Sequence, residues 1–152
     1  MAPSFFTGNT PTTGACEIAT PTYTAADGVI HKRGESWGCL TWTTDDPRFS
    51  GTSKDIWNTD DYTTGSHPAT GRTGDIIAGR ERIENADGAW EGTWTVLDVE
   101  SFHQVAGWFE GEGAYSGLAA YVVITDARGD STVWGMISPS GRLEPPDAFV
   151  GG

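Results

Sequence analysis

Two short segments of this chain have nearly the same sequence, and each places glycines around one aromatic residue. The first is Gly88-Ala89-Trp90-Glu91-Gly92 and the second is Gly113-Ala114-Tyr115-Ser116-Gly117. Each leads into a strand-like apolar run. Glycine permits a kink or a close approach of two strands, and an aromatic side chain covers the surface that glycine leaves bare. The repeat therefore predicts a strongly curved antiparallel sheet.

The composition supports a sheet protein and excludes some partners. The chain has 152 residues, enough for one domain with its own core, and 21 of them are glycine, which weakens helix interiors. The formal net charge of −12 repels nucleic acid and anionic membranes, so we expect no nucleic-acid partner. The sequence has no apolar run of about 18 residues, so we expect no membrane insertion.

Turn signals divide the chain into short extended segments, and no segment has the period of an amphipathic helix. We predict an all-β fold, a single antiparallel β-barrel of about eight strands, with a β-sandwich as the alternative. The predicted domain covers residues 14–140, between a flexible N-terminal lead-in (1–13) and a C-terminal tail (141–152). The expected strands cover residues 15–24, 29–33, 37–44, 49–57, 74–84, 89–96, 102–110, 115–125 and 131–138.

Two of these strands carry apolar residues on both faces. In the segment 102–110, Ala106 and Trp108 alternate with Val105 and Phe109, and the segment 115–125 is apolar throughout. Such a strand in a small antiparallel protein needs a second layer, a subunit partner or an apolar ligand cavity. The pattern therefore leaves a homo-oligomer open and favours a barrel with a cavity.

Two residues are candidates for acid–base chemistry. Glu81 lies between Arg80 and Arg82 in a predicted strand, so it faces away from both arginines. If it faces inward, burial raises its pKa and makes it a proton donor; a surface ion-pair ladder is the alternative. His103, beside Phe102, is a second candidate acid or base, or else an ordinary strand histidine.

The aromatic residues are the main candidates for ligand contacts, although we expect most of them to build the core. Aromatic side chains exposed in a cavity bind a flat or greasy ligand, and in an exposed row they stack on sugar rings. We select four candidates for ligand binding: Trp94, Trp108, Tyr121 and Trp134.

The two cysteines, Cys16 and Cys39, form a disulfide if their strands are neighbours, and otherwise are two buried thiols. The sequence has no metal-ligand pattern and no nucleotide fingerprint, so we expect no metal and no cofactor. The N-terminus has no signal peptide, so the chain is either a mature secreted form with a start methionine or a cytoplasmic protein.

One stretch resembles a known superfamily. The spacing of Gly111, Gly113, Tyr115, Gly117 and Leu118 is similar to a motif of the allene oxide cyclase-like barrels, which include plant allene oxide cyclases, dirigent-like proteins and bacterial spirotetronate cyclases. The run 87–94 also resembles a group of small, mostly secreted bacterial proteins. The resemblance implies an eight-stranded antiparallel barrel with a hydrophobic cavity open at one end, and it carries over no catalytic residue.

These observations lead to one expected function and one alternative. We expect a barrel that binds a small hydrophobic molecule and that acts as a cyclase or isomerase by holding its substrate in a reactive shape. The alternative is a non-catalytic secreted module that binds carbohydrate or is purely structural.

Overall fold

The computed structural model describes residues 2–12, 17–18, 21–26, 28–62, 74–99, 102–126 and 131–139, and they form an all-β fold. A single-turn 3-10 helix, η1 (Pro47–Phe49), connects two of the strands. The strands are β1 (Ser4–Thr12), β2 (Glu17–Ile18), β3 (Thr22–Thr24), β4 (Ile30–Thr44), β5 (Gly51–Asp61), β6 (Gly74–Glu84), β7 (Gly88–Val99), β8 (Phe102–Gly113), β9 (Ala119–Asp126) and β10 (Ser131–Ser138).

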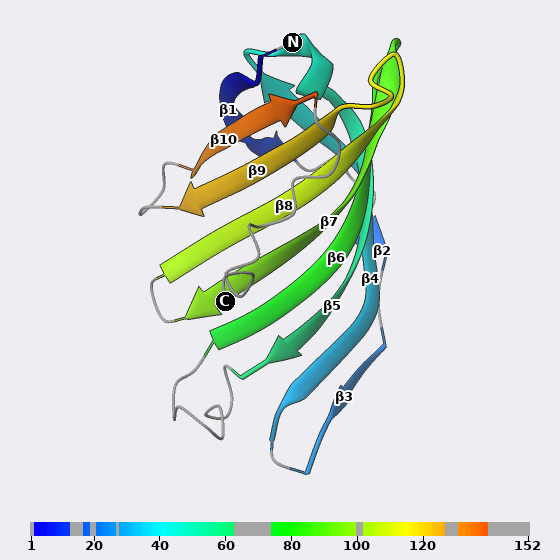
Figure 1. Ribbon diagram of the computed structural model, residues 1–152. Coiled ribbons are helices and arrows are strands. Elements are labelled where there is room, and N and C mark those ends of the chain that lie inside the picture. The colour runs from blue at the N-terminus through cyan, green and yellow to red at the C-terminus, as the bar shows by residue number, and fades with distance from the viewer. Residues whose placement is uncertain are drawn as a thin grey trace, which may run out of the picture.

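Eight of the described strands close into an antiparallel barrel, which confirms the predicted fold class and excludes the sandwich. The order is β1-β10-β9-β8-β7-β6-β5-β4, and β1 pairs with β4 to complete the ring. The short strands β2 and β3 pair with the part of β4 that extends beyond β1. Figure 1 shows the long strands β4–β8 sweeping around the molecule, with β3 at the end opposite to β1.

Alternation along each strand sorts side chains between the interior and the outer surface. On β7, Trp90 and Val96 are buried, whereas Glu91, Thr93 and Thr95 are exposed. The same period places Phe109 inside on β8. The two-faced strands that the sequence predicts therefore belong to a barrel whose interior is apolar and whose outer face carries further aromatic residues.

One end of the barrel is filled by aromatic side chains. Phe49 of η1 is fully buried, and its ring centroid lies 4.9 Å from that of Phe6 and 5.3 Å from that of Phe109. Asp46 caps η1 by accepting a hydrogen bond from the backbone N–H of Arg48. This end of the barrel is therefore filled by packed aromatic rings.

The glycine-rich repeat is located at the same filled end. The first copy lies at the start of β7, and the second begins at the end of β8 and continues into the turn before β9. The two copies meet where Gly88 pairs with Gly113, whose φ of +64° favours glycine. The Trp90 and Tyr115 rings stack with centroids 5.2 Å apart and planes 12° apart. Tyr115 covers Gly88, as expected, so the repeat makes a tightly packed corner of the barrel.

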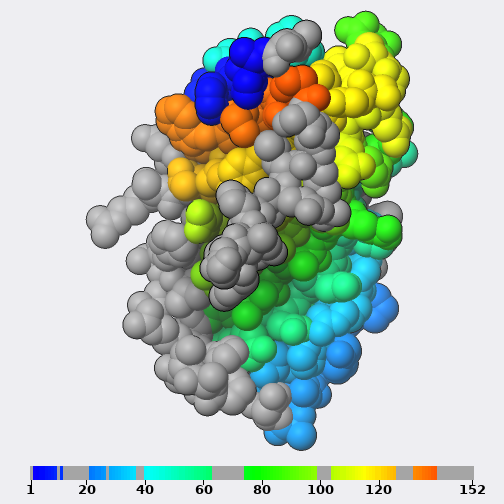
Figure 2. All heavy atoms as spheres, viewed as in Figure 1, coloured from blue at the N-terminus to red at the C-terminus, as the bar shows by residue number. Residues whose placement is uncertain are grey.

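The structure differs from the sequence prediction at the N-terminus. Residues 4–12, expected in a flexible lead-in, form β1, and Figure 2 shows this blue strand packed against the orange β10. Their Thr, Asn and Gly content is typical of a loop, but Gly8 allows β4 to approach closely. The expected strands 29–33 and 37–44 are one strand, β4.

Three of the predicted features cannot be compared with the structure. Cys16, the side chain of Cys39 and the tail 141–152 lie outside the described residues.

Candidate functional site

The middle of the barrel is shaped by a row of paired positions in which bulky residues alternate with glycine. The row crosses seven strands, from β5 to β10 and on to β1. A Cβ atom on Gly135 would lie 2.0 Å from the Phe6 ring, and one on Gly79 would lie 2.6 Å from the Trp94 ring. The glycines thus make room for the large rings. In order, the row is Trp57, Gly79, Trp94, Gly107, Val122, Gly135 and Phe6.

A cavity of about 350 Å³ is formed at this row and its neighbours. That volume is in the range of small-molecule sites. Its walls are mainly aromatic and aliphatic, and two carboxyl side chains are part of them. The main lining residues are Leu40, Trp42, Asp55, Trp57, Ile77, Glu81, Trp94, Val96, Val105, Phe109, Val122 and Ile124.

Glu81 is the buried acid of this cavity. Its side chain faces inward from β6, the residue is 5% exposed, and its Oε1 accepts a 2.7 Å hydrogen bond from Nε1 of Trp42. Burial raises the pKa of Glu81 to about 7. The hydrogen bond from Trp42 has the opposite, smaller effect, because it favours the charged form. A carboxyl group with this pKa both donates and accepts a proton near neutral pH.

Asp55 of β5 is directly opposite Glu81 in the strand register and also lines the cavity. Residues so placed have Cβ atoms about 5 Å apart. The negative charge of Asp55 contributes to the raised pKa of Glu81. The cavity therefore holds two adjacent carboxyl groups on neighbouring strands.

Two indole rings face the cavity next to these carboxyl groups. The centroids of Trp57 and Trp94 lie 6.1 Å apart with the planes tilted by 45°. The Nε1 atom of Trp94 is buried and has no hydrogen-bond acceptor among the described residues. A ligand oxygen in the cavity is a natural acceptor for this N–H.

A row of acidic residues crosses the strands at the end of the barrel away from η1. Asp61 pairs with Asp75, and Asp75 pairs with Asp98, all in register. Burial, together with the charge of Asp61, raises the pKa of Asp75 to about 6. The backbones of His103 and Asp126 continue the same row on β8 and β9.

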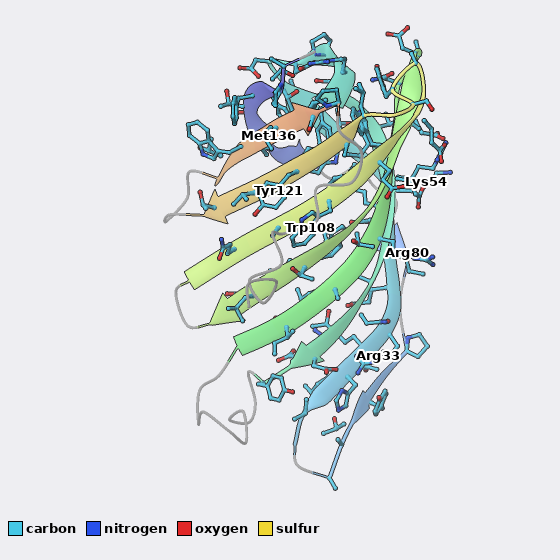
Figure 3. The ribbon with its side chains drawn as sticks, in the orientation of Figure 1. Arg33, Lys54, Arg80, Trp108, Tyr121 and Met136 are labelled. Carbon is cyan, nitrogen blue, oxygen red and sulfur yellow. The ribbon has the colours of Figure 1, made fainter. Side chains whose placement is uncertain are left out.

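Three of the four aromatic candidates lie on the outer face of the barrel. Trp108 and Tyr121 are paired on β8 and β9, with ring centroids 5.6 Å apart, and Trp134 of β10 is 56% exposed. Figure 3 shows Trp108, Tyr121 and Met136 on three successive strands. Together with Phe5, which is 80% exposed and paired with Met136, they form an outer aromatic surface.

The structure thus separates residues that the sequence prediction grouped in one site. Trp94 and Glu81 line the cavity; Trp108, Tyr121 and Trp134 do not. The side chain of His103 lies outside the described residues. The ion-pair ladder considered for Glu81 exists around its neighbour Arg82, which contacts Glu84, Glu91 and Glu112 on the outer surface.

Sequence reasoning did not select Asp55, Trp57 or Trp42 for the site. The alternation of Ser53, Asp55 and Trp57 along one face of β5 was the available signal. It could not be used alone, because a strand pattern does not say which neighbouring strand supplies the opposite residue.

Among the residues that the structure describes, no group of three His, Cys, Asp or Glu side chains is placed to hold a metal ion. The same residues include no helix with the length and apolarity needed to cross a membrane. Comparisons with protein-family models, with curated proteins and with solved structures found no match.

Proposed function

We propose that this barrel binds a small hydrophobic molecule in its cavity, and that Glu81 transfers a proton in a cyclisation or isomerisation of that molecule. The observation that carries the proposal is a buried carboxyl group, 5% exposed, in the wall of an apolar cavity of about 350 Å³. Shape and apolar contacts hold the substrate, and Glu81 is within the same wall to give or take the proton.

The polar groups of the cavity fit this role. Trp42 fixes one oxygen of Glu81 by a hydrogen bond, so the carboxyl group has a defined orientation. The unused N–H of Trp94 offers a hydrogen bond to a ligand oxygen on which charge develops. The resemblance of residues 111–118 to allene oxide cyclase-like barrels belongs with this proposal, since that superfamily includes cyclases.

Binding is tested with the neutral fluorophore N-phenyl-1-naphthylamine, which becomes bright in apolar sites. We expect saturable binding to the wild type. Val96→Phe, which fills the cavity, should weaken binding about tenfold or more. Thr95→Phe adds the same ring to the adjacent, exposed position and is the matched control. Absence of saturable binding to the wild type would contradict the proposed function.

Proton transfer is tested with 5-nitrobenzisoxazole. Removal of its ring C–H proton by a base breaks the N–O bond and releases a coloured cyanophenolate, so no other reactant is needed. We expect the wild type to accelerate this opening, with a rate that rises with pH and levels off above about 7. Glu81→Gln should lose the acceleration, and equal rates in both proteins would exclude Glu81 as the base.

The outer aromatic surface supports a second candidate function. Trp108, Tyr121 and Trp134 lie on three successive strands, with Trp134 exposed and the other two half-buried, and aromatic rings at the surface of a sheet can stack on sugars. This favours the carbohydrate-binding alternative. The test is retention on insoluble polysaccharides. We expect Trp134→Ala to release the protein and Val96→Phe to leave it bound, and no retention of the wild type would contradict this function.

A further inference from the structure

The ionisable side chains in the cavity wall are both acidic. Asp55 and Glu81 line it from adjacent strands, and no lysine, arginine or histidine lines it among the described residues. An apolar cavity strengthens every electrostatic interaction inside it because there is little water to screen charge. A ligand that carries a negative charge is therefore disfavoured.

The aromatic walls add a second preference. Trp57 and Trp94 present two tilted rings, 6.1 Å between centroids, next to the carboxyl groups. A cation within about 6 Å of an indole ring is attracted by its electron-rich face. Aromatic side chains combined with carboxyl groups are a suitable environment for an ammonium group with an apolar body.

The end of the barrel away from η1 also carries acidic side chains. Asp61, Asp75 and Asp98 occupy one row across β5, β6 and β7. Lys32 of β4 contacts this row, with its Nζ 3.3 Å from Oδ2 of Asp61. The carboxyl groups of this row therefore favour the approach of a cation to the cavity.

We propose that the natural ligand of the cavity is a hydrophobic amine in its ammonium form. The charge lies between Asp55 and Glu81 and against the rings of Trp57 and Trp94. The apolar body contacts the aliphatic wall of Ile77, Val96, Val105 and Ile124. The proposal rests on the proposed function, since it names the class of molecule that the same cavity takes.

Binding of such a cation is coupled to the protonation of Glu81. The described side chains that interact with Glu81 are Asp55 and Ser53 from β5 and Trp42 from β4, and among them only Asp55 is titratable. The neighbour of Glu81 on β7 in the strand register is Gly92, which has no side chain. An ammonium group beside Glu81 favours its charged form. Affinity should therefore rise by about tenfold between pH 6 and pH 8 and the protein should release a proton on binding.

Three compounds with one apolar body and different polar groups test the proposal. They are 1-aminoadamantane, 1-hydroxyadamantane and 1-adamantanecarboxylate, and their affinities are measured by calorimetry at pH 6, 7 and 8. We expect the amine to bind about tenfold tighter than the alcohol at pH 8, and the carboxylate to bind weakest. Buffers of different ionisation enthalpy report the released proton.

Variants separate the charge from the cavity. Glu81→Gln and Asp55→Asn should each reduce the preference for amine over alcohol while alcohol binding remains, and Glu110→Gln, on the exposed outer face, is the matched control. Equal affinities of the wild type for amine and alcohol would overturn the amine proposal and leave the apolar cavity intact. Absence of binding by all three compounds would overturn the proposed function, and this inference with it.

Discussion

Nε1 of Trp42 donates a 2.7 Å hydrogen bond to Oε1 of Glu81 inside the barrel. The two residues lie on β4 and β6, so the bond passes the intervening strand β5. It connects the filled aromatic end, to which Trp42 belongs, with the acid of the cavity wall. Residues that support the fold and residues that give the cavity its chemistry therefore meet at this pair.

The first prediction concerns stability and pH. The pKa of Glu81 is raised from 4.5 to about 7 in the folded protein, so the folded state binds a proton more tightly than the unfolded state. The contribution of Glu81 to stability is then largest below about pH 4.5, falls as the pH rises to about 7, and is constant above it, a loss of about 3 kcal/mol.

Urea unfolding at pH 5 and pH 8 measures this loss. Glu81→Gln has no charge to bury, so its stability should change less between the two pH values. Asp75, whose pKa is raised to about 6, acts in the same direction, and Asp75→Asn separates its contribution. An equal pH dependence of the wild type and Glu81→Gln would contradict the assignment of this titration to Glu81.

The second prediction concerns the hydrogen bond itself. Since the indole N–H favours the charged form of Glu81, Trp42→Phe should raise the pKa of Glu81 further above 7. Titration of the carboxyl carbon by NMR follows the change. Trp94→Phe is the control, because the Nε1 of Trp94 has no acceptor among the described residues. A lower pKa of Glu81 in Trp42→Phe would contradict the prediction.

The fold could be predicted from the sequence because its signals are local. The Asp87-Gly88 turn, the alternation along β7 and the two-faced strands each follow from neighbouring residues, and they agree with one another. β1 could not be predicted in this way. Its residues resemble a loop, and they are extended because they pair with β10 and β4, which are far away in sequence.

The site could be predicted only in part for a related physical reason. Alternation placed Trp94 and Glu81 on definite faces of their own strands, but the juxtaposition of Glu81 with Asp55 depends on the register of β5 and β6. Which face of β8 points into the barrel, and so whether Trp108 lies inside or outside, depends on how the barrel closes. Each strand pattern therefore gives two faces, and closure decides which of them is inside.

The third prediction tests the glycine row. A Cβ on Gly135 would lie 2.0 Å from the Phe6 ring, so Gly135→Ala should destabilise the protein by about 1–3 kcal/mol through overpacking. Phe6→Leu removes part of the ring, and the double variant should recover part of the loss. The four free energies of unfolding give the coupling. Additive effects of the two substitutions would show that the ring does not occupy the space above Gly135.

The last prediction tests the corner formed by the glycine-rich repeat. The Tyr115 ring stacks on Trp90, and its hydroxyl donates a 2.9 Å hydrogen bond to Oδ1 of Asn85. Tyr115→Phe keeps the ring and loses the hydrogen bond, so it should cost about 1 kcal/mol. Tyr115→Leu loses the stacking as well and should cost about 1 kcal/mol more.

Urea unfolding gives both free energies, and near-UV circular dichroism reports the stacked rings directly. The Phe variant should keep most of the aromatic signal and the Leu variant should reduce it. Because Tyr115 also covers Gly88, which pairs with Gly113, loss of the ring exposes the backbone where the two copies of the repeat meet. Equal stability of the Phe and Leu variants would mean that the hydrogen bond to Asn85 holds this corner, and that the aromatic residue of the repeat adds nothing by stacking.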